Sequence, residues 1–102
     1  MVLSTRRTFE LVGIENIDDL YNQVVQHLQL ADWFGRNLDA LDDVLRGDCG
    51  AVDPKGTTFV WKESAQSKTL LGENLFDEIV DVFRTHSRGG EEEDDDVELV
   101  LV

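Results

Sequence analysis

Residues 57–61 read TTFVW, an uncharged run of β-branched and aromatic residues. Residues of these types are enriched in strands, and a mostly apolar run of this length is typical of a strand covered on both faces. The preceding residues 46–56 (RGDCGAVDPKG) hold three glycines and the only proline of the chain, which predicts a loop. The run therefore predicts a buried strand that is reached through a loop.

One strand and two helices are predicted upstream of this run. Residues 8–12 alternate in polarity and end at Gly13, which predicts a short strand. Two helices follow, the first capped by Asn16 and the second by Asn37. Their apolar positions are Ile17, Leu20, Tyr21, Val24, Val25 and Leu28 in the first helix, and Leu38, Leu41, Val44 and Leu45 in the second.

Two helices and one strand are predicted downstream. Ser64 is the expected cap of a short helix, and Asn74 with Asp77 resembles a capping box that starts a fourth helix. The acidic residues 91–96 (EEEDDD) predict an exposed loop, and the β-prone residues 97–102 predict a last strand. The fourth helix is expected to bury Phe76, Ile79, Val80 and Phe83.

The order of these elements predicts the fold class. Each connection between strands contains helices, so each is long enough to return the chain parallel to the previous strand. We therefore expect an α/β fold in which a three-stranded parallel sheet packs with about four helices. Residues 1–102 form a single domain in this interpretation, since about 100 residues is a common domain size.

The charge of the chain restricts its partners. Twenty-two acidic residues against nine basic ones give a formal net charge of −13, and the acidity extends beyond residues 91–96. Such a surface repels nucleic acids and anionic membranes and attracts basic proteins. The start of the chain has no long apolar run behind its two arginines, so no signal peptide is expected and a cytoplasmic location is predicted.

Enzyme and metal chemistry find little support in the sequence. Carboxylate pairs such as Asp39 and Asp43 are easy to choose among 22 acidic residues, so a hydrolase based on them has little specificity. The single cysteine, Cys49, is interpreted as incidental, and no Cys or His pair has zinc-ligand spacing. His27 and His86 are expected at the surface or at a helix cap. No catalytic residue, cofactor or metal site is predicted.

The second helix carries the most informative pattern. Asp39, Asp42 and Asp43 share the helix face opposite its apolar stripe, and the rings of Trp33 and Phe34 stand just before the helix. A solvated helix face is the simpler interpretation. Large rings beside carboxylates also suit a protein interface, although Phe34 is expected to belong to the core.

Three segments resemble the barstar family, intracellular proteins that inhibit secreted microbial ribonucleases. They are WFGRNLDALDDVL at residues 33–45, FVWKESAQSK at 59–68 and FDEIVDVFR at 76–84. The resemblance covers residues 8–102 and implies a bacterial inhibitor that binds the active-site cleft of a guanyl-specific microbial ribonuclease as a 1:1 complex.

The resemblance also implies roles for individual residues. Asp43 would replace the substrate phosphate, Asp39 would contact the cleft nearby, and Trp33 would cover the catalytic histidine of the enzyme. Gly35 and Asn37 would shape the loop and cap the helix. The complete set of partner-binding candidates is Trp33, Phe34, Gly35, Arg36, Asn37, Asp39, Asp42, Asp43, Arg46 and Thr85.

Departures from the family pattern leave the target open. Arg36 and Thr85 stand where the best-known member has acidic residues, and Asp42 stands where it has an aromatic residue. We hypothesise that Asp42 and the acidic run 91–96 compensate for the two lost acids. An immunity or regulatory module on the same scaffold, binding another basic protein, is the alternative function.

Overall fold

A computed structural model describes residues 6–30, 34–47 and 50–102 of the chain. Its elements follow the expected order, with one short additional 3-10 helix, η1, inside the acidic run. They are β1 (Arg7–Leu11), α1 (Ile17–Leu28), α2 (Leu38–Arg46), β2 (Thr57–Trp61), α3 (Ser64–Leu71), α4 (Glu73–Thr85), η1 (Glu93–Asp95) and β3 (Val97–Leu101).

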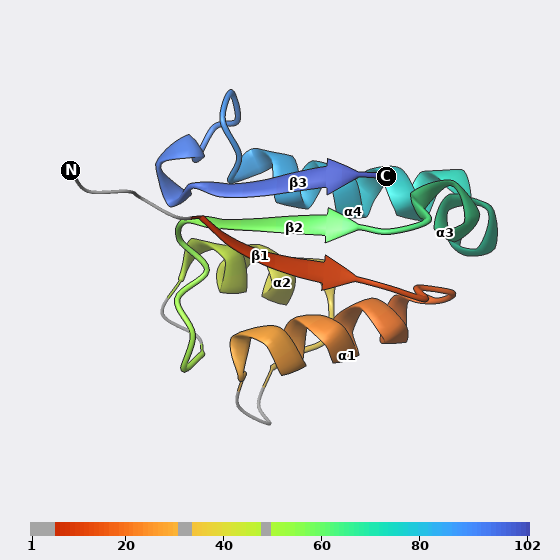
Figure 1. Cartoon of the computed structure of the whole chain (residues 1–102), viewed down its shortest axis with the longest axis horizontal. Helices are drawn as coiled ribbons and strands as arrows, with labels where there is room; N and C mark the ends of the chain where they lie inside the picture. Colours follow the sequence, from red (N-terminus) through yellow and green to blue (C-terminus); the bar gives the residue numbers. More distant parts are fainter. Residues whose placement is uncertain (1–5, 31–33, 48–49) are drawn as a thin grey trace.

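The three strands form one parallel sheet in the order β1-β2-β3 (Figure 1). The register places Phe9 of β1 beside Phe59 of β2, which in turn lies beside Leu99 of β3. The predicted α/β fold, with three parallel strands and four α-helices, is confirmed. Helices α2 and α4 lie behind the sheet in Figure 1, and α1 runs along the β1 side.

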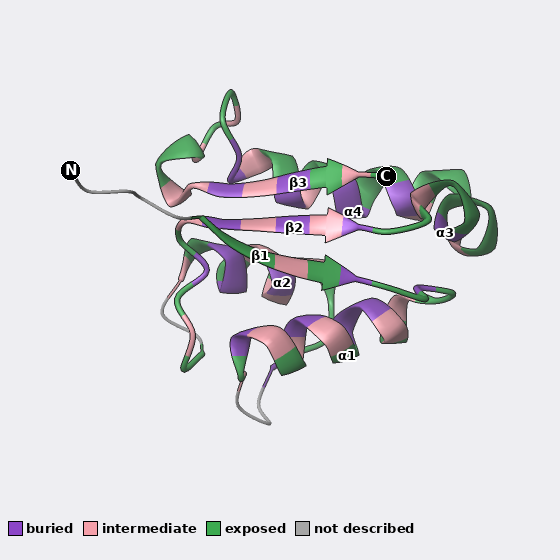
Figure 2. Cartoon of the chain, in the orientation of Figure 1, coloured by how far each residue is buried: buried purple, intermediate pink, exposed green. Residues whose placement is uncertain are grey.

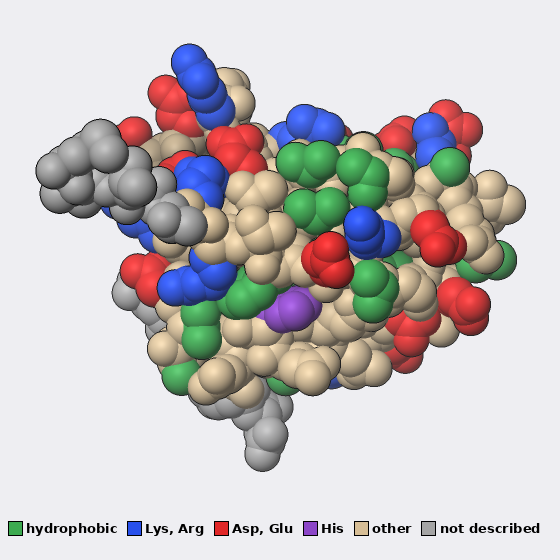
Figure 3. Space-filling view, in the orientation of Figure 1, with side chains coloured by type: hydrophobic (Ala, Val, Ile, Leu, Met, Phe, Trp, Pro, Cys, Tyr) green, Lys and Arg blue, Asp and Glu red, His purple; other side chains and the backbone are tan. Residues whose placement is uncertain are grey.

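Within the described residues, helices cover one face of the sheet (Figure 1), so the expectation that residues 57–61 are covered on both faces is wrong. Buried and half-buried residues alternate along β2 (Figure 2), with Phe59 and Trp61 buried and Val60 half-buried. The open face is turned toward the viewer in Figure 3, where hydrophobic side chains gather over β2 and β3. Val100 is 42% exposed there. Threonine and valine fit a half-exposed strand as well as a buried one, so composition alone did not distinguish the two cases.

The covered face carries an aromatic core. Phe59 packs edge-on against Phe83 of α4 with ring centroids 5.3 Å apart, and Trp61 packs on Phe76 at 5.0 Å. Aromatic pairs at these separations add to the stabilisation that burial gives. The predicted apolar residues of α4 are all buried, as is most of each predicted stripe on α1 and α2. The core therefore joins α2 and α4 to the sheet.

Two of the predicted helix starts are correct and two are wrong. The Asn16 and Asn37 side chains accept hydrogen bonds from backbone N–H groups at the starts of α1 and α2. Ser64, in contrast, is the first residue of α3 rather than its cap. Helix α4 begins at Glu73, directly after Gly72, which also ends α3. Gly72 thus lies between the two helices and flanks both of them. Asn74 is inside α4, so it cannot form the predicted capping box at the start of that helix.

Candidate functional site

The loop before α2 is fixed by local contacts. Phe34 is buried, as predicted, with its ring edge-on against Tyr21 of α1 at a centroid separation of 5.8 Å. The Asn37 side chain caps α2 through a 2.7 Å hydrogen bond from the Ala40 N–H. A Cβ atom on Gly35 would lie only 3.2 Å from the Asn37 amide nitrogen, so a side chain there would crowd the cap. These contacts hold the start of α2 in one place.

Arg36 has the left-handed backbone of this turn, with φ at 52°, a conformation that costs a non-glycine residue about 1 kcal/mol. Its side chain is held by α1. The guanidinium donates to the Asn22 side-chain oxygen at 2.9 Å and lies 3.6 Å from the Asp18 carboxylate. It also stacks over the ring of Tyr21 at 5.7 Å from its centroid. Arg36 therefore fastens the loop to α1.

The three acidic residues of α2 differ in exposure and contacts. Asp39 is exposed and has no ion-pair partner among the described residues. Asp43 is 68% exposed, whereas Asp42 is only 28% exposed and turns toward α4. The predicted common acidic face is therefore correct for Asp39 and Asp43 and wrong for Asp42.

His86 explains the position of Asp42. It is the C-cap residue of α4, as one part of the sequence prediction allowed, but its side chain is fully buried rather than at the surface. Its Nε2 lies 2.6 Å from Asp42 Oδ1, and its Nδ1 lies 2.7 Å from Asp95 Oδ2. The buried ring therefore lies between two carboxyl groups, and each of its nitrogens is within hydrogen-bond distance of one of them.

Arg46 adds a guanidinium to this cluster, and each of its nitrogens contacts a different acid. Its Nη2 lies 2.8 Å from Asp42, its Nη1 lies 2.8 Å from Asp43, and its Nε lies 2.8 Å from Glu92. The hydrogen bond to Glu92 is the largest cause that raises the pKa of Arg46, and the charges of the three carboxylates add to it. Together, Arg46 and His86 join α2, the end of α4 and the acidic run into one ion-pair network.

The sequence predicted that the acidic run is an exposed loop, and this prediction is only partly correct. Residues 93–95 form η1, the Glu92 N–H donates to the Thr85 carbonyl at 2.8 Å, and Asp96 pairs with Arg6 at 2.6 Å. Glu91 and Asp94 remain exposed. The run is fastened beside α2, and part of its charge is used inside the protein.

A metal site is a possible interpretation of this network, because Asp42, His86 and Glu92 bring ligand-type atoms within 4.8 Å of one another. The arrangement of charges argues against it. Asp42 and Glu92 contact opposite nitrogens of the ring, and Arg46 already pairs with both carboxylates. A metal ion would have to replace a ring proton and approach this guanidinium. We therefore assign these residues to an ion-pair network.

The structure brings most of the predicted partner-binding residues together at α2. Helix α2 and the turn before it contain residues 34–37, Asp39, Asp43 and Arg46. Thr85 is the last residue of α4, and its carbonyl accepts a hydrogen bond from the Glu92 N–H of the acidic run. Trp33 and Cys49 lie outside the described residues. Sequence reasoning did not predict that His86, Glu92 and Asp95 pair within the protein beside α2, although a histidine just before an acidic run was a usable signal for pairing.

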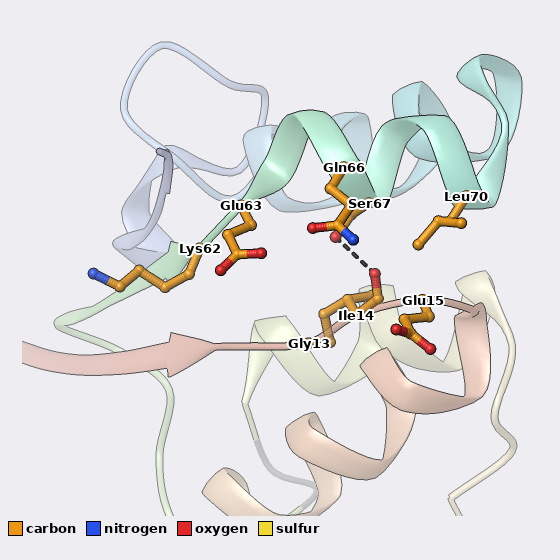
Figure 4. Close-up of a pocket in the computed structure, with 8 residues that line it drawn as sticks. All are labelled: Gly13, Ile14, Glu15, Lys62, Glu63, Gln66, Ser67 and Leu70. Carbon is orange, nitrogen blue, oxygen red and sulfur yellow. Dashed lines mark hydrogen bonds between the residues drawn. The ribbon is translucent and has the colours of Figure 1, made fainter.

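A hollow lies elsewhere, at the carboxyl ends of β1 and β2, where parallel sheets often bind ligands. Gly13, Ile14 and α3 residues line it (Figure 4). Its buried hydroxyl, that of Ser67, donates to the Ile14 carbonyl at 2.7 Å and accepts from Trp61 Nε1 at 3.0 Å. That hydroxyl is thus engaged within the fold.

Comparison with known proteins gives one family. The family model described as Barstar (barnase inhibitor) matches residues 5–102, which is essentially the entire chain. No match was found among curated proteins. None of the helices in the described part of the chain has the length and apolar character needed to span a membrane.

Proposed function

The chain belongs to the barstar family, and we propose that it inhibits a guanyl-specific microbial ribonuclease by binding the active-site cleft as a 1:1 complex. The single observation that carries this proposal is the pair of exposed carboxylates, Asp39 and Asp43, on a helix whose start is firmly fixed. The net charge of −13 supports attraction to a basic enzyme.

Asp43 is the residue proposed to take the place of the substrate phosphate. A cleft that binds phosphate offers several cationic donors, and a carboxylate held by such donors forms strong, charge-assisted hydrogen bonds. Asp39 would contact the same cleft, and the resemblance to the family assigns Trp33 to cover the catalytic histidine. The inward contacts of Asp42 support a structural role for that residue instead.

The test is a stoichiometric titration of such a ribonuclease with this protein, following RNA cleavage at two salt concentrations. We expect activity to disappear at one equivalent and Asp43→Ala to inhibit much more weakly. Asp77→Ala is the matched control, because Asp77 is an exposed helical aspartate on α4 that has no contact with the network. Full activity in large excess of the protein, across several such enzymes, would contradict the proposal and favour another basic partner.

The hypothesis that acidic residues 91–96 aid binding needs a variant that preserves the fold. Neutralising Asp95 and Asp96 would break contacts with His86 and Arg6. Glu91→Gln combined with Asp94→Asn removes two exposed charges without breaking a hydrogen bond or ion pair of the described residues. Slower association at low salt is expected, since charges near an interface mainly change the association rate. An unchanged rate would rule the hypothesis out.

A further inference from the structure

Asp43, the residue proposed to enter the cleft, is already paired within the protein. Its Oδ1 lies 2.8 Å from Arg46 Nη1, one helical turn away. Arg46 also holds Asp42 and Glu92, so its guanidinium remains anchored whether or not Asp43 stays bound. In the free protein, the Arg46 guanidinium is therefore paired with the carboxylate that a partner would need to bind.

The exposure of Asp42 and Asp43 shows which of their ion pairs with Arg46 a partner can replace. The Asp43 and Arg46 side chains are 68% and 44% exposed, so water and salt weaken their attraction. Asp42 is only 28% exposed and has both Arg46 and the buried His86 as partners. Asp43 can leave its partner at small cost, whereas Asp42 cannot.

We propose that Arg46 is a specificity-determining residue that competes with the partner for Asp43. This inference rests on the proposed function, in which Asp43 contacts a cationic cleft. A cleft with several converging guanidinium or ammonium groups displaces Arg46, because multiple charge-assisted bonds outweigh one exposed pair. A partner that offers a single lysine gains little over the internal pair. Arg46 thus favours partners with clustered cations.

The test compares Arg46→Gln with Arg84→Gln in binding to the ribonuclease at low salt. Both variants lose one positive charge, but Arg84 is an exposed residue without an ion-pair partner among those described. We expect Arg46→Gln to tighten binding about two- to fivefold more than Arg84→Gln, which is the range of an exposed ion pair. In an Asp43→Asn background, this difference between the two variants should vanish.

A second probe separates failure of this inference from failure of the proposed function. If the unmodified protein binds no ribonuclease, the proposed function fails, and a short oligoarginine peptide then tests the competition by the same variants. Tighter peptide binding by Arg46→Gln than by Arg84→Gln, lost with Asp43→Asn, supports the inference. Equal or weaker binding by Arg46→Gln, or no binding at all, overturns it. Urea unfolding of each variant verifies that the fold is retained.

Discussion

The buried contacts of His86 give the sharpest prediction about stability. We consider His86→Gln, which keeps a polar side chain but removes one of the two ring nitrogens that contact Asp42 and Asp95. His27→Gln is the matched control, since His27 lies on the half-exposed side of α1, where Nε2 donates one hydrogen bond to the Glu10 carbonyl.

The magnitude follows from the contacts that the substitution removes. A hydrogen bond to a charged group contributes about 1.5–3 kcal/mol, and His86 makes two such bonds while fully buried. Asp42 and Asp95 are 28% and 26% exposed, so water replaces part of each lost bond, and Arg46 still pairs with Asp42. We expect a net loss of about 2–3 kcal/mol, a large part of the roughly 5–15 kcal/mol that stabilises a domain. His27→Gln should lower the unfolding free energy less, by about 1–2 kcal/mol, because it removes one partly exposed hydrogen bond and the stacking of the ring on Phe9.

Urea unfolding at neutral pH, followed by tryptophan fluorescence, measures both values. The urea dependence of the unfolding free energy should be unchanged, because the surface exposed on unfolding is nearly the same. A loss equal to that of His27→Gln would refute the stabilising role of the two His86 contacts.

Three further predictions concern other parts of the fold. Burial raises the pKa of Tyr21 above its ordinary value of 10.0, although the charge of Arg36 opposes this shift. The unfolded chain therefore loses the Tyr21 proton at a lower pH than the folded protein, so stability should fall as pH rises past about 10. Tyr21→Phe should remove this fall in urea unfolding. Ser67→Ala should lower the unfolding free energy by about 1–3 kcal/mol in the same assay, because it leaves two buried polar groups without a partner. Ser64→Ala at the edge of α3 should lower it by about 1 kcal/mol or less. A Cβ atom on Gly90 would overlap the Arg84 and Thr85 carbonyl oxygens, so Gly90→Ala should detach the acidic run and increase its hydrogen exchange; normal exchange there would contradict this.

The sequence predicted the elements well where local signals determine them. Asn16 and Asn37 cap their helices as expected because an N-cap depends on only four consecutive residues. The open face of the sheet could not be predicted from TTFVW, since coverage depends on where distant helices pack. The start of α4 was missed because Gly72 serves two helices at once.

The candidate site was predictable only in part, for a similar reason. The spacing of Asp39, Asp42 and Asp43 places their backbones on one helix face, but long-range contacts decide where each side chain points. Asp42 and His86 are 44 residues apart, so no local pattern indicates their pairing. Helical periodicity therefore identified the acidic helix and could not separate its partner-facing residues from its internal ones.

The ion-pair network also changes the expected source of attraction to a basic partner. Asp42 was expected to compensate for acids missing at positions 36 and 85, yet its carboxylate is paired with Arg46 and contacts His86. Three acids of the acidic run are likewise engaged inside the protein: Glu92 with Arg46, Asp95 with His86 and Asp96 with Arg6. A paired charge contributes little to the long-range field. Attraction should therefore depend on the exposed acids that lack a cation, such as Asp39, rather than on the total of acidic residues near α2.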